Sequence, residues 1–129
     1  MNQERGSLSV LLAGYLALAV LLGVSMAAVG ISLVAKNRIQ GVADSAVLYA
    51  HDRAVKKGIP DRVKLQVAIQ KFLQTAPSAT QLEIASIDLK VIGAESQLVL
   101  CARHSDPFGV AINSGFICRK SAAKSFRVD

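Results

Sequence analysis

The most prominent pattern in the chain is an apolar segment close to its start. Residues 6–35 contain no Asp, Glu, Lys or Arg, and apolar side chains fall on every side of a helix built from them. Such a helix is about 45 Å long, which exceeds the roughly 30 Å hydrocarbon core of a bilayer. The segment therefore predicts a membrane-spanning helix that tilts or protrudes.

Two other interpretations explain this segment less well. Ser25-Met26-Ala27 resembles the cleavage site of a secretory signal, but apolar residues continue beyond it through Ile31 and Val34. A buried helix of a soluble protein would need other strongly apolar segments around it, and the sequence offers none. A retained membrane helix is therefore the favoured interpretation.

The pattern becomes amphipathic beyond Lys36. Apolar residues recur at the spacing of one helix face while polar residues take the other faces; the apolar positions are Ile39, Val42, Ala43, Ala46, Val47 and Ala50. Because no Pro interrupts this stretch, one continuous helix is predicted to run from the membrane to about Val55. Gly58 and Pro60 are expected to end it.

A second, shorter helix is predicted after this point. Pro60 and Asp61 suit a first helical turn, because Pro lacks an N–H that would need a partner and Asp favours the positive end of the helix dipole. A stripe at helical spacing follows, formed by Leu65, Ala68, Ile69, Phe72 and Leu73. Pro77 is expected to stop this helix.

The period then changes from 3.6 to 2, which is typical of strands. Apolar and polar residues alternate over 82–91, and a slip of phase at 85–86 indicates a bulge or a break. After a turn at 93–94, further strands are predicted at 98–103 and 116–120. The predicted fold class is α+β and pilin-like: a long helix, a second short helix and a small antiparallel sheet of about three strands.

Cys101 and Cys118 are the only cysteines, and the predicted sheet carries them on two strands. A disulfide between them would add about 3 kcal/mol of stability, which is a large share for so small a head. Such a bond requires an oxidising compartment. The alternative is a pair of buried, unbonded thiols. Neither histidine has metal-ligand spacing to the cysteines, so no metal site is predicted.

Two signals disagree on the side of the membrane that the head occupies. Lys36 and Arg38 follow the apolar segment directly, and the positive-inside rule would place them in the cytoplasm. The cysteine pair favours the outside. We give the cysteines more weight and expect a single-pass protein of the cytoplasmic membrane, with a cytoplasmic tail over 1–7, a transmembrane helix over 8–35 and an extracytoplasmic head over 36–129.

The sequence carries no recognisable catalytic pattern. No glycine-rich phosphate loop follows a strand, and no set of Ser, His and Asp has a supporting motif. His51 is expected to be a surface or boundary residue, and His104 with Asp106 a solvated loop pair. We therefore predict a protein that is not an enzyme and that takes no cofactor, metal or small-molecule substrate.

The chain is basic overall. Its net charge is +6, and a candidate basic patch lies near its end, formed by Arg119, Lys120, Lys124 and Arg127. Such a patch can bind nucleic acid, anionic lipid headgroups or acidic wall polymers. Only Phe116 and Phe126 stand nearby to stack on bases, so nucleic acid is a less favoured partner. A solvated basic tail is the simpler account.

Small residues recur on the apolar helix. Ala19, Gly23 and Ala27 are spaced four apart, and so are Ala13 and Ala17. Small side chains let two helices approach closely in lipid, where packing drives association. The sequence therefore predicts a helix-packing face, although ordinary use of Ala and Gly in membrane helices gives a similar pattern.

Motifs around the apolar segment resemble one family. Arg5-Gly6-Ser7 stands directly before the segment, residues 34–40 form a basic exit, and residues 40–46 follow a Gln-x-x-Ala-Asp-x-Ala pattern. These features resemble the TadE/TadG-like proteins of tight-adherence (Flp-type) pilus systems. Leu100-Cys101-Ala102-Arg103, together with Cys118, is similar to a short actinobacterial branch of TadE-like proteins encoded near secretion or DNA-translocation genes.

The resemblance implies a minor pilin or pseudopilin, which is a low-abundance subunit of a pilus or secretion filament. The partners that it implies are the membrane, major and minor pilins, and the platform proteins of the assembly machine. A DNA-binding pseudopilin and an envelope protein unrelated to pili are the alternatives. Pilin-like members carry a Glu five residues after a Gly cleavage site, and here that position is Leu11. The resemblance therefore does not predict cleavage after Gly6.

Overall fold

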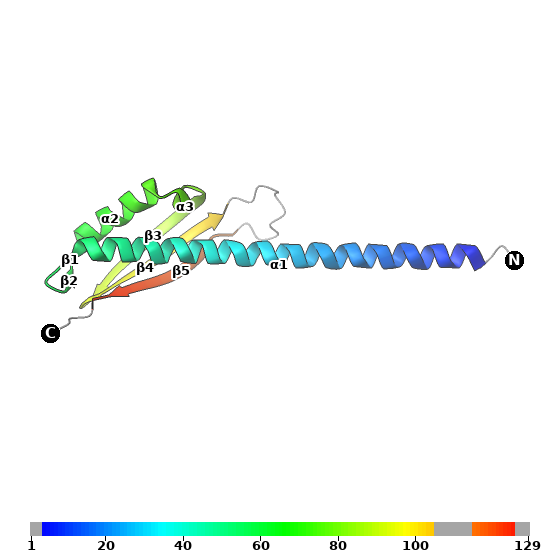
Figure 1. Ribbon diagram of the computed structural model, residues 1–129, viewed down its shortest axis with the longest axis horizontal. Coiled ribbons are helices and arrows are strands. Elements are labelled where there is room, and N and C mark those ends of the chain that lie inside the picture. Colours follow the sequence, from blue (N-terminus) through cyan, green and yellow to red (C-terminus); the bar gives the residue numbers. More distant parts are fainter. Residues whose placement is uncertain (1–3, 105–114, 126–129) are drawn as a thin grey trace.

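The computed structural model describes residues 4–104 and 115–125. One helix, α1 (Glu4–Ala54), runs along the whole molecule, and its C-terminal half is the spine of a small head (Figure 1). The other elements follow in the order β1 (Val55–Lys56), β2 (Ile59–Pro60), α2 (Arg62–Thr75), α3 (Pro77–Thr80), β3 (Leu82–Ile92), β4 (Glu95–His104) and β5 (Ile117–Lys124). The predicted α+β class, with a long apolar helix and a small antiparallel sheet, is confirmed.

Helix α1 ends in a tight hairpin that the sequence analysis did not predict. Strands β1 and β2 pair antiparallel, and Lys57 and Gly58 between them both have positive φ, at 53° and 81°. Two successive residues with positive φ form the two-residue turn whose twist best matches that of the flanking strands. Gly at the second position adopts a positive φ without steric cost. The Asp61 N–H then donates to the Ala54 carbonyl at 3.1 Å, which closes the hairpin against the end of α1.

Helix α2 begins where the sequence predicted it. Asp61 is its N-cap, and the carboxylate accepts hydrogen bonds from the N–H groups of Val63 and Lys64 at 2.9 and 3.4 Å. These bonds satisfy two of the backbone donors that every helix start leaves unpaired. The helix ends before Pro77, and this proline opens the one-turn helix α3, which was not predicted.

The three-stranded sheet has the order β3-β4-β5, and both pairs of strands are antiparallel. Gly93, with φ of 59°, helps to form the turn between β3 and β4. The register shifts between Ile84 and Ser86, which confirms the irregularity predicted there. Strands β4 and β5 extend beyond the predicted ranges 98–103 and 116–120, because their ends alternate small and polar side chains that give a weak apolar signal.

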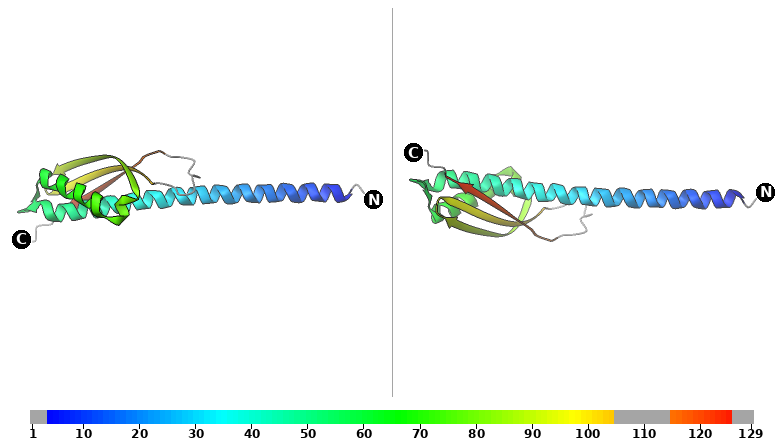
Figure 2. Two further views of the ribbon diagram at one scale, coloured as in Figure 1. Left: turned by 90° about the horizontal axis from the view of Figure 1, so that it is seen from above. Right: turned by 90° about the horizontal axis from the view of Figure 1, so that it is seen from below.

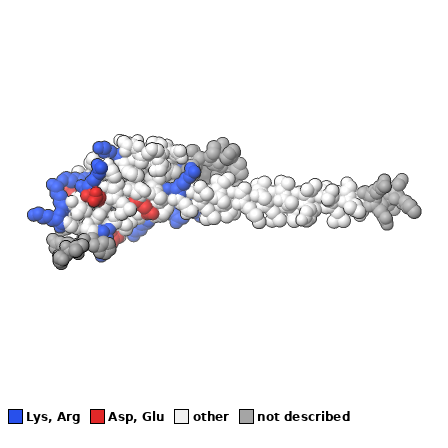
Figure 3. Space-filling model, viewed as in Figure 1, with Lys and Arg blue, Asp and Glu red and all other residues white. Residues whose placement is uncertain are grey.

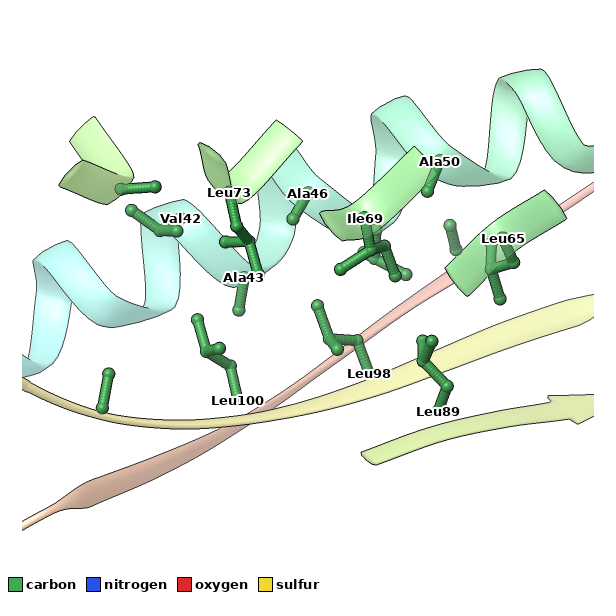
Figure 4. Close-up of a cluster of buried hydrophobic side chains, with 14 of the residues drawn as sticks. Val42, Ala43, Ala46, Ala50, Leu65, Ile69, Leu73, Leu89, Leu98 and Leu100 are labelled. Atoms are coloured by element: carbon green, nitrogen blue, oxygen red, sulfur yellow. The ribbon is translucent and has the colours of Figure 1, made fainter. Parts of the chain in front are cut away.

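Helices α1 and α2 cover one face of the sheet (Figure 2). The core lies between these layers, and Figure 4 shows leucines of the sheet directed toward the two helices. On α1 the buried stripe is largely alanine, which allows a close approach of helix and sheet. The main buried side chains are Ile39, Ala43, Ala46, Val47 and Ala50 of α1, Leu65, Ile69 and Leu73 of α2, and Leu89, Leu98 and Leu100 of the sheet. Burying one such leucine contributes about 1.5–3 kcal/mol.

The other face of the sheet is polar and is not covered by a described helix. Glu83 and Arg103 lie opposite each other on β3 and β4 there, and their side chains form an ion pair at 2.6 Å. Both side chains are largely exposed, so this pair adds little stability. The head is therefore a two-layer structure with a single core.

Candidate functional site: the exposed half of α1 and the surfaces of the head

The N-terminal half of α1 has no covering from the rest of the described chain. Side chains from Gly6 to Val34 are exposed, apart from Ala28 and Ile31, which are half-buried. Figure 3 shows this stretch free of Lys, Arg, Asp and Glu on the visible face, while charges of both signs gather on the head. The first buried side chain along the helix is Ala35.

Among the described residues, α1 is the one helix that is long and apolar enough to cross a membrane. Its most apolar window has a mean hydropathy of 2.4, and none of that window is buried. The Ser25 hydroxyl donates to the Leu21 carbonyl at 2.8 Å, so this polar group is satisfied within the helix, as a lipid environment requires. These features fit a single-pass membrane protein.

The predicted packing residues lie on one broad side of this exposed half. At 100° per residue, Ala13 and Ala17 together with Ala19, Gly23 and Ala27 occupy a sector of roughly 160°. A Cβ atom added to Gly23 would meet no atom within 4 Å. The glycine is therefore not required by any described contact within the chain. The same holds for Gly14, Gly30 and Gly41, so the monomer leaves these positions open without distinguishing Gly23 among them.

A disulfide lies on the polar face of the sheet. Cys101 of β4 and Cys118 of β5 are directly opposite in the register, and their sulfur atoms are 1.98 Å apart. The bridge predicted from the cysteine pair is present. It closes a loop between residues that are 17 apart in the sequence, which lowers the entropy of the unfolded chain.

The candidate basic patch is divided by the alternation of β5. Lys120 and Lys124 are exposed on the polar face of the sheet, whereas Arg119 is directed toward the opposite face. The Arg119 Nε is buried and has no hydrogen-bond partner among the described atoms. Arg127 lies outside the described residues. The described part of the patch therefore contributes two lysines to one surface.

A buried polar link joins α1 to the sheet, and the sequence analysis placed its central residue wrongly. His51 was expected at the surface or boundary, but it is only 8% exposed. Its Nδ1 lies 2.7 Å from the Ser96 hydroxyl of β4, and its Nε2 lies 2.7 Å from the Ser125 hydroxyl. His51 stands four residues after the buried Val47 and three before the buried Ala54, so helical spacing already gave the signal that was missed.

This link is suited to stability rather than to chemistry. A serine hydroxyl beside a histidine nitrogen is the arrangement of a nucleophile and its base. Ser96, however, is fully buried, so a substrate has no access to it. The Ser125 hydroxyl is part-buried, and the two groups bonded to His51 are serines rather than a carboxylate that would orient a base. The position of the His104 side chain, which the sequence analysis paired with Asp106, lies outside the described residues.

The chain was also compared with known proteins. No family model, curated protein or solved structure matches it.

Proposed function

We propose that this protein is a membrane-anchored structural subunit, a minor pilin or pseudopilin of a tight-adherence (Flp-type) pilus or a related secretion system. One observation carries the proposal: a single helix of 51 residues has an apolar, uncovered half and a half that is built into an α+β head. No hinge separates the two halves. The position and orientation of the head are therefore fixed by the membrane or the neighbouring helices that surround the apolar half.

The mechanism that we propose is packing without catalysis. In lipid or in a filament, the side of α1 that carries Ala19, Gly23 and Ala27 docks against other helices, because small side chains allow close backbone contact. The head then stands rigidly at the base or the tip of the assembly. Such a subunit initiates, caps or regulates the filament through the surface that its head presents.

We further propose that the head lies outside the cytoplasmic membrane. The support is the bridge between Cys101 and Cys118, because disulfides form and persist in oxidising compartments. Lys36 and Arg38, at the exit of the apolar half, argue for the opposite orientation. Placement by a dedicated assembly machine would override this charge rule.

A substitution at Gly23 tests the packing mechanism. Gly23→Leu is expected to abolish co-purification of the full-length protein with pilus components from detergent-solubilised membranes of the host. The isolated protein should fold normally, because the added side chain meets open space in the monomer. Ser25→Leu is the matched control: it enlarges a side chain at the same depth but roughly 200° away around the helix. Unchanged association of the Gly23 variant would refute helix docking.

The side of the membrane is tested separately with thiol labelling in intact cells. A membrane-impermeant reductant followed by an impermeant thiol reagent should label Cys101 and Cys118, and labelling should fail without the reductant. Labelling that needs cell lysis but no reductant would place the head in the cytoplasm. That result would exclude the pilin-like role, whatever the packing of the helix.

A further inference from the structure

A groove with an apolar lining lies between the C-terminal end of α1 and helix α2. Its volume is about 300 Å³, and its apolar lining is formed by Tyr49 of α1 and by Val63, Val67 and Ala68 of α2. Val63 and Val67 are 71% and 60% exposed, although the buried stripe of α2 runs through Leu65, Ile69 and Leu73. Because they are four residues apart, the two valines stand side by side on the helix surface. The core of the head does not account for them.

The groove is held in shape by aromatic contacts. The centroid of the Tyr49 ring lies 5.4 Å from that of the Phe72 ring, and this pair joins α1 to α2 beside the groove. The Arg53 guanidinium lies over the Tyr49 ring, with its Cζ 4.1 Å from the ring centroid. A cation stacked in this way is pre-positioned at the rim and loses little freedom when an anion binds.

The rim of the groove is positive. Arg53, Lys64 and Lys71 line it, and none of the described residues that line it is acidic. The neighbouring Lys56 lowers the pKa of Lys64 through a hydrogen bond and through charge repulsion, and burial adds to this, whereas Asp61 acts in the opposite direction. The Asp61 carboxylate, which also caps α2, therefore does not balance the positive charge beside the groove.

We propose that this groove is a docking site for an acidic amphipathic segment of another protein. Apolar side chains of the segment, spaced three or four apart, fit over Val63 and Val67, and flanking carboxylates pair with the three cations of the rim. Charge complementarity selects this occupant. The inference concerns the surface of the head and holds independently of the pilus assignment.

Other occupants fit the groove less well. Arg53 lies 18 residues beyond Ala35, about 27 Å farther along α1, so the groove is too far from the membrane that holds the apolar half to contact its headgroups. The chain carries a net charge of +6, so a second copy suits this basic groove less well than an acidic segment does. The two exposed valines offer a nucleic acid neither stacking nor a hydrogen bond, and the Tyr49 ring already stacks with Arg53.

The test uses the full-length protein in nanodiscs of zwitterionic lipid, with empty nanodiscs as the blank. The probe is a fluorescent helical peptide of about 14 residues with leucines on one side and glutamates on the other, and binding is followed by anisotropy. We expect saturable binding to the protein, weakened by salt, and no binding of the same peptide with serines in place of leucines. Absence of binding by the leucine peptide would overturn the proposal.

Matched variants localise the binding. Val63→Ser with Val67→Ser, and separately Lys64→Glu with Lys71→Glu, should each weaken binding about tenfold or more, which is about 1.4 kcal/mol. Ile92→Ser and the pair Lys90→Glu with Lys120→Glu change exposed residues of the sheet and should have little effect. If the control pair Lys90→Glu with Lys120→Glu weakens peptide binding equally, the effect comes from net charge alone and the site is refuted. If duplex DNA displaces the peptide, and does so equally well when Val63 and Val67 are replaced, the groove would be assigned to nucleic acid instead.

Discussion

The two halves of α1 have the same backbone conformation but differ in what determines their side chains. Between Gly6 and Val34, large apolar residues point to all sides, and all of them except the half-buried Ile31 are exposed; Leu22, for example, is 53% exposed. Beyond Ala35, small apolar residues form one stripe that the sheet and α2 cover completely. The covered half is specified by contacts within the chain, and the uncovered half by an environment that the chain does not supply.

This difference separates residues that the fold of the head requires from residues that it does not require. The stripe of α1 in the head is rich in alanine because it must approach a sheet that belongs to the same chain. The apolar half contains Ala and Gly without such a neighbour, so its small residues are available for other helices. Equivalent truncations in the two halves are therefore expected to have unequal effects on the stability of the head.

The largest expected effect comes from Ile39→Ala in the covered half. Ile39 is fully buried, so its truncation leaves a cavity and should lower the free energy of unfolding of the head by about 2–5 kcal/mol. Leu22→Ala in the uncovered half should change it by less than about 0.5 kcal/mol. Calorimetry of both variants in the same detergent measures this difference. Equal losses would mean that the two halves are not independent.

Removal of the disulfide should have the next largest effect and should be confined to the head. Cys101→Ser with Cys118→Ser should cost about 3 kcal/mol through the greater entropy of the unfolded chain. Circular dichroism should show a lower melting temperature of the head, while the helical signal of the apolar half persists. A reductant should reproduce this shift in the native protein and leave the double variant unchanged. A shift in the variant on reduction would point to another cause.

Sequence periodicity was sufficient to predict most of the head, because its main elements are long enough to show a period. The extent of α1, the start of α2 and the shift of register near Ala85 all follow from local pattern. The β1–β2 hairpin and α3 were missed because strands of two residues and a helix of one turn show no period. Strand ends rich in Ser, Ala and Lys were missed for the related reason that small residues can be buried without looking apolar.

The candidate sites were predictable only in part. Spacing alone indicated the small-residue side of α1, and the two cysteines indicated the bridge. The polar link of His51 required knowing that Ser96 faces α1, which depends on the register of β4. The groove required the relative position of α1 and α2, although Val63 and Val67, outside the apolar stripe of α2, were already unusual in the sequence.

The polar link tests whether the covered half of α1 is specified by more than apolar contact. Ser96→Ala leaves the buried Nδ1 of His51 without its partner, so it should cost about 1–3 kcal/mol in the free energy of unfolding. Ser45→Ala, at an exposed position of α1, is the control and should be nearly neutral. Combining Ser96→Ala with His51→Ala should cost less than the sum of the single variants. Additive costs would show that the contact adds no stability of its own.

The smallest expected effect concerns charge at the end of the covered half, where Lys56 lowers the pKa of Lys64 below its ordinary value of 10.5. Between the two values the unfolded chain binds more protons than the folded one, so stability from this lysine rises with pH across that window and the repulsion persists below it. Lys56→Gln should raise the pKa of Lys64 toward 10.5 and flatten this rise, and an NMR titration of the Lys64 ammonium group measures the pKa directly. Lys90→Gln, on the far face of the sheet, should leave it unchanged. If Lys56→Gln also leaves it unchanged, Lys56 is not the cause of the lowered pKa of Lys64.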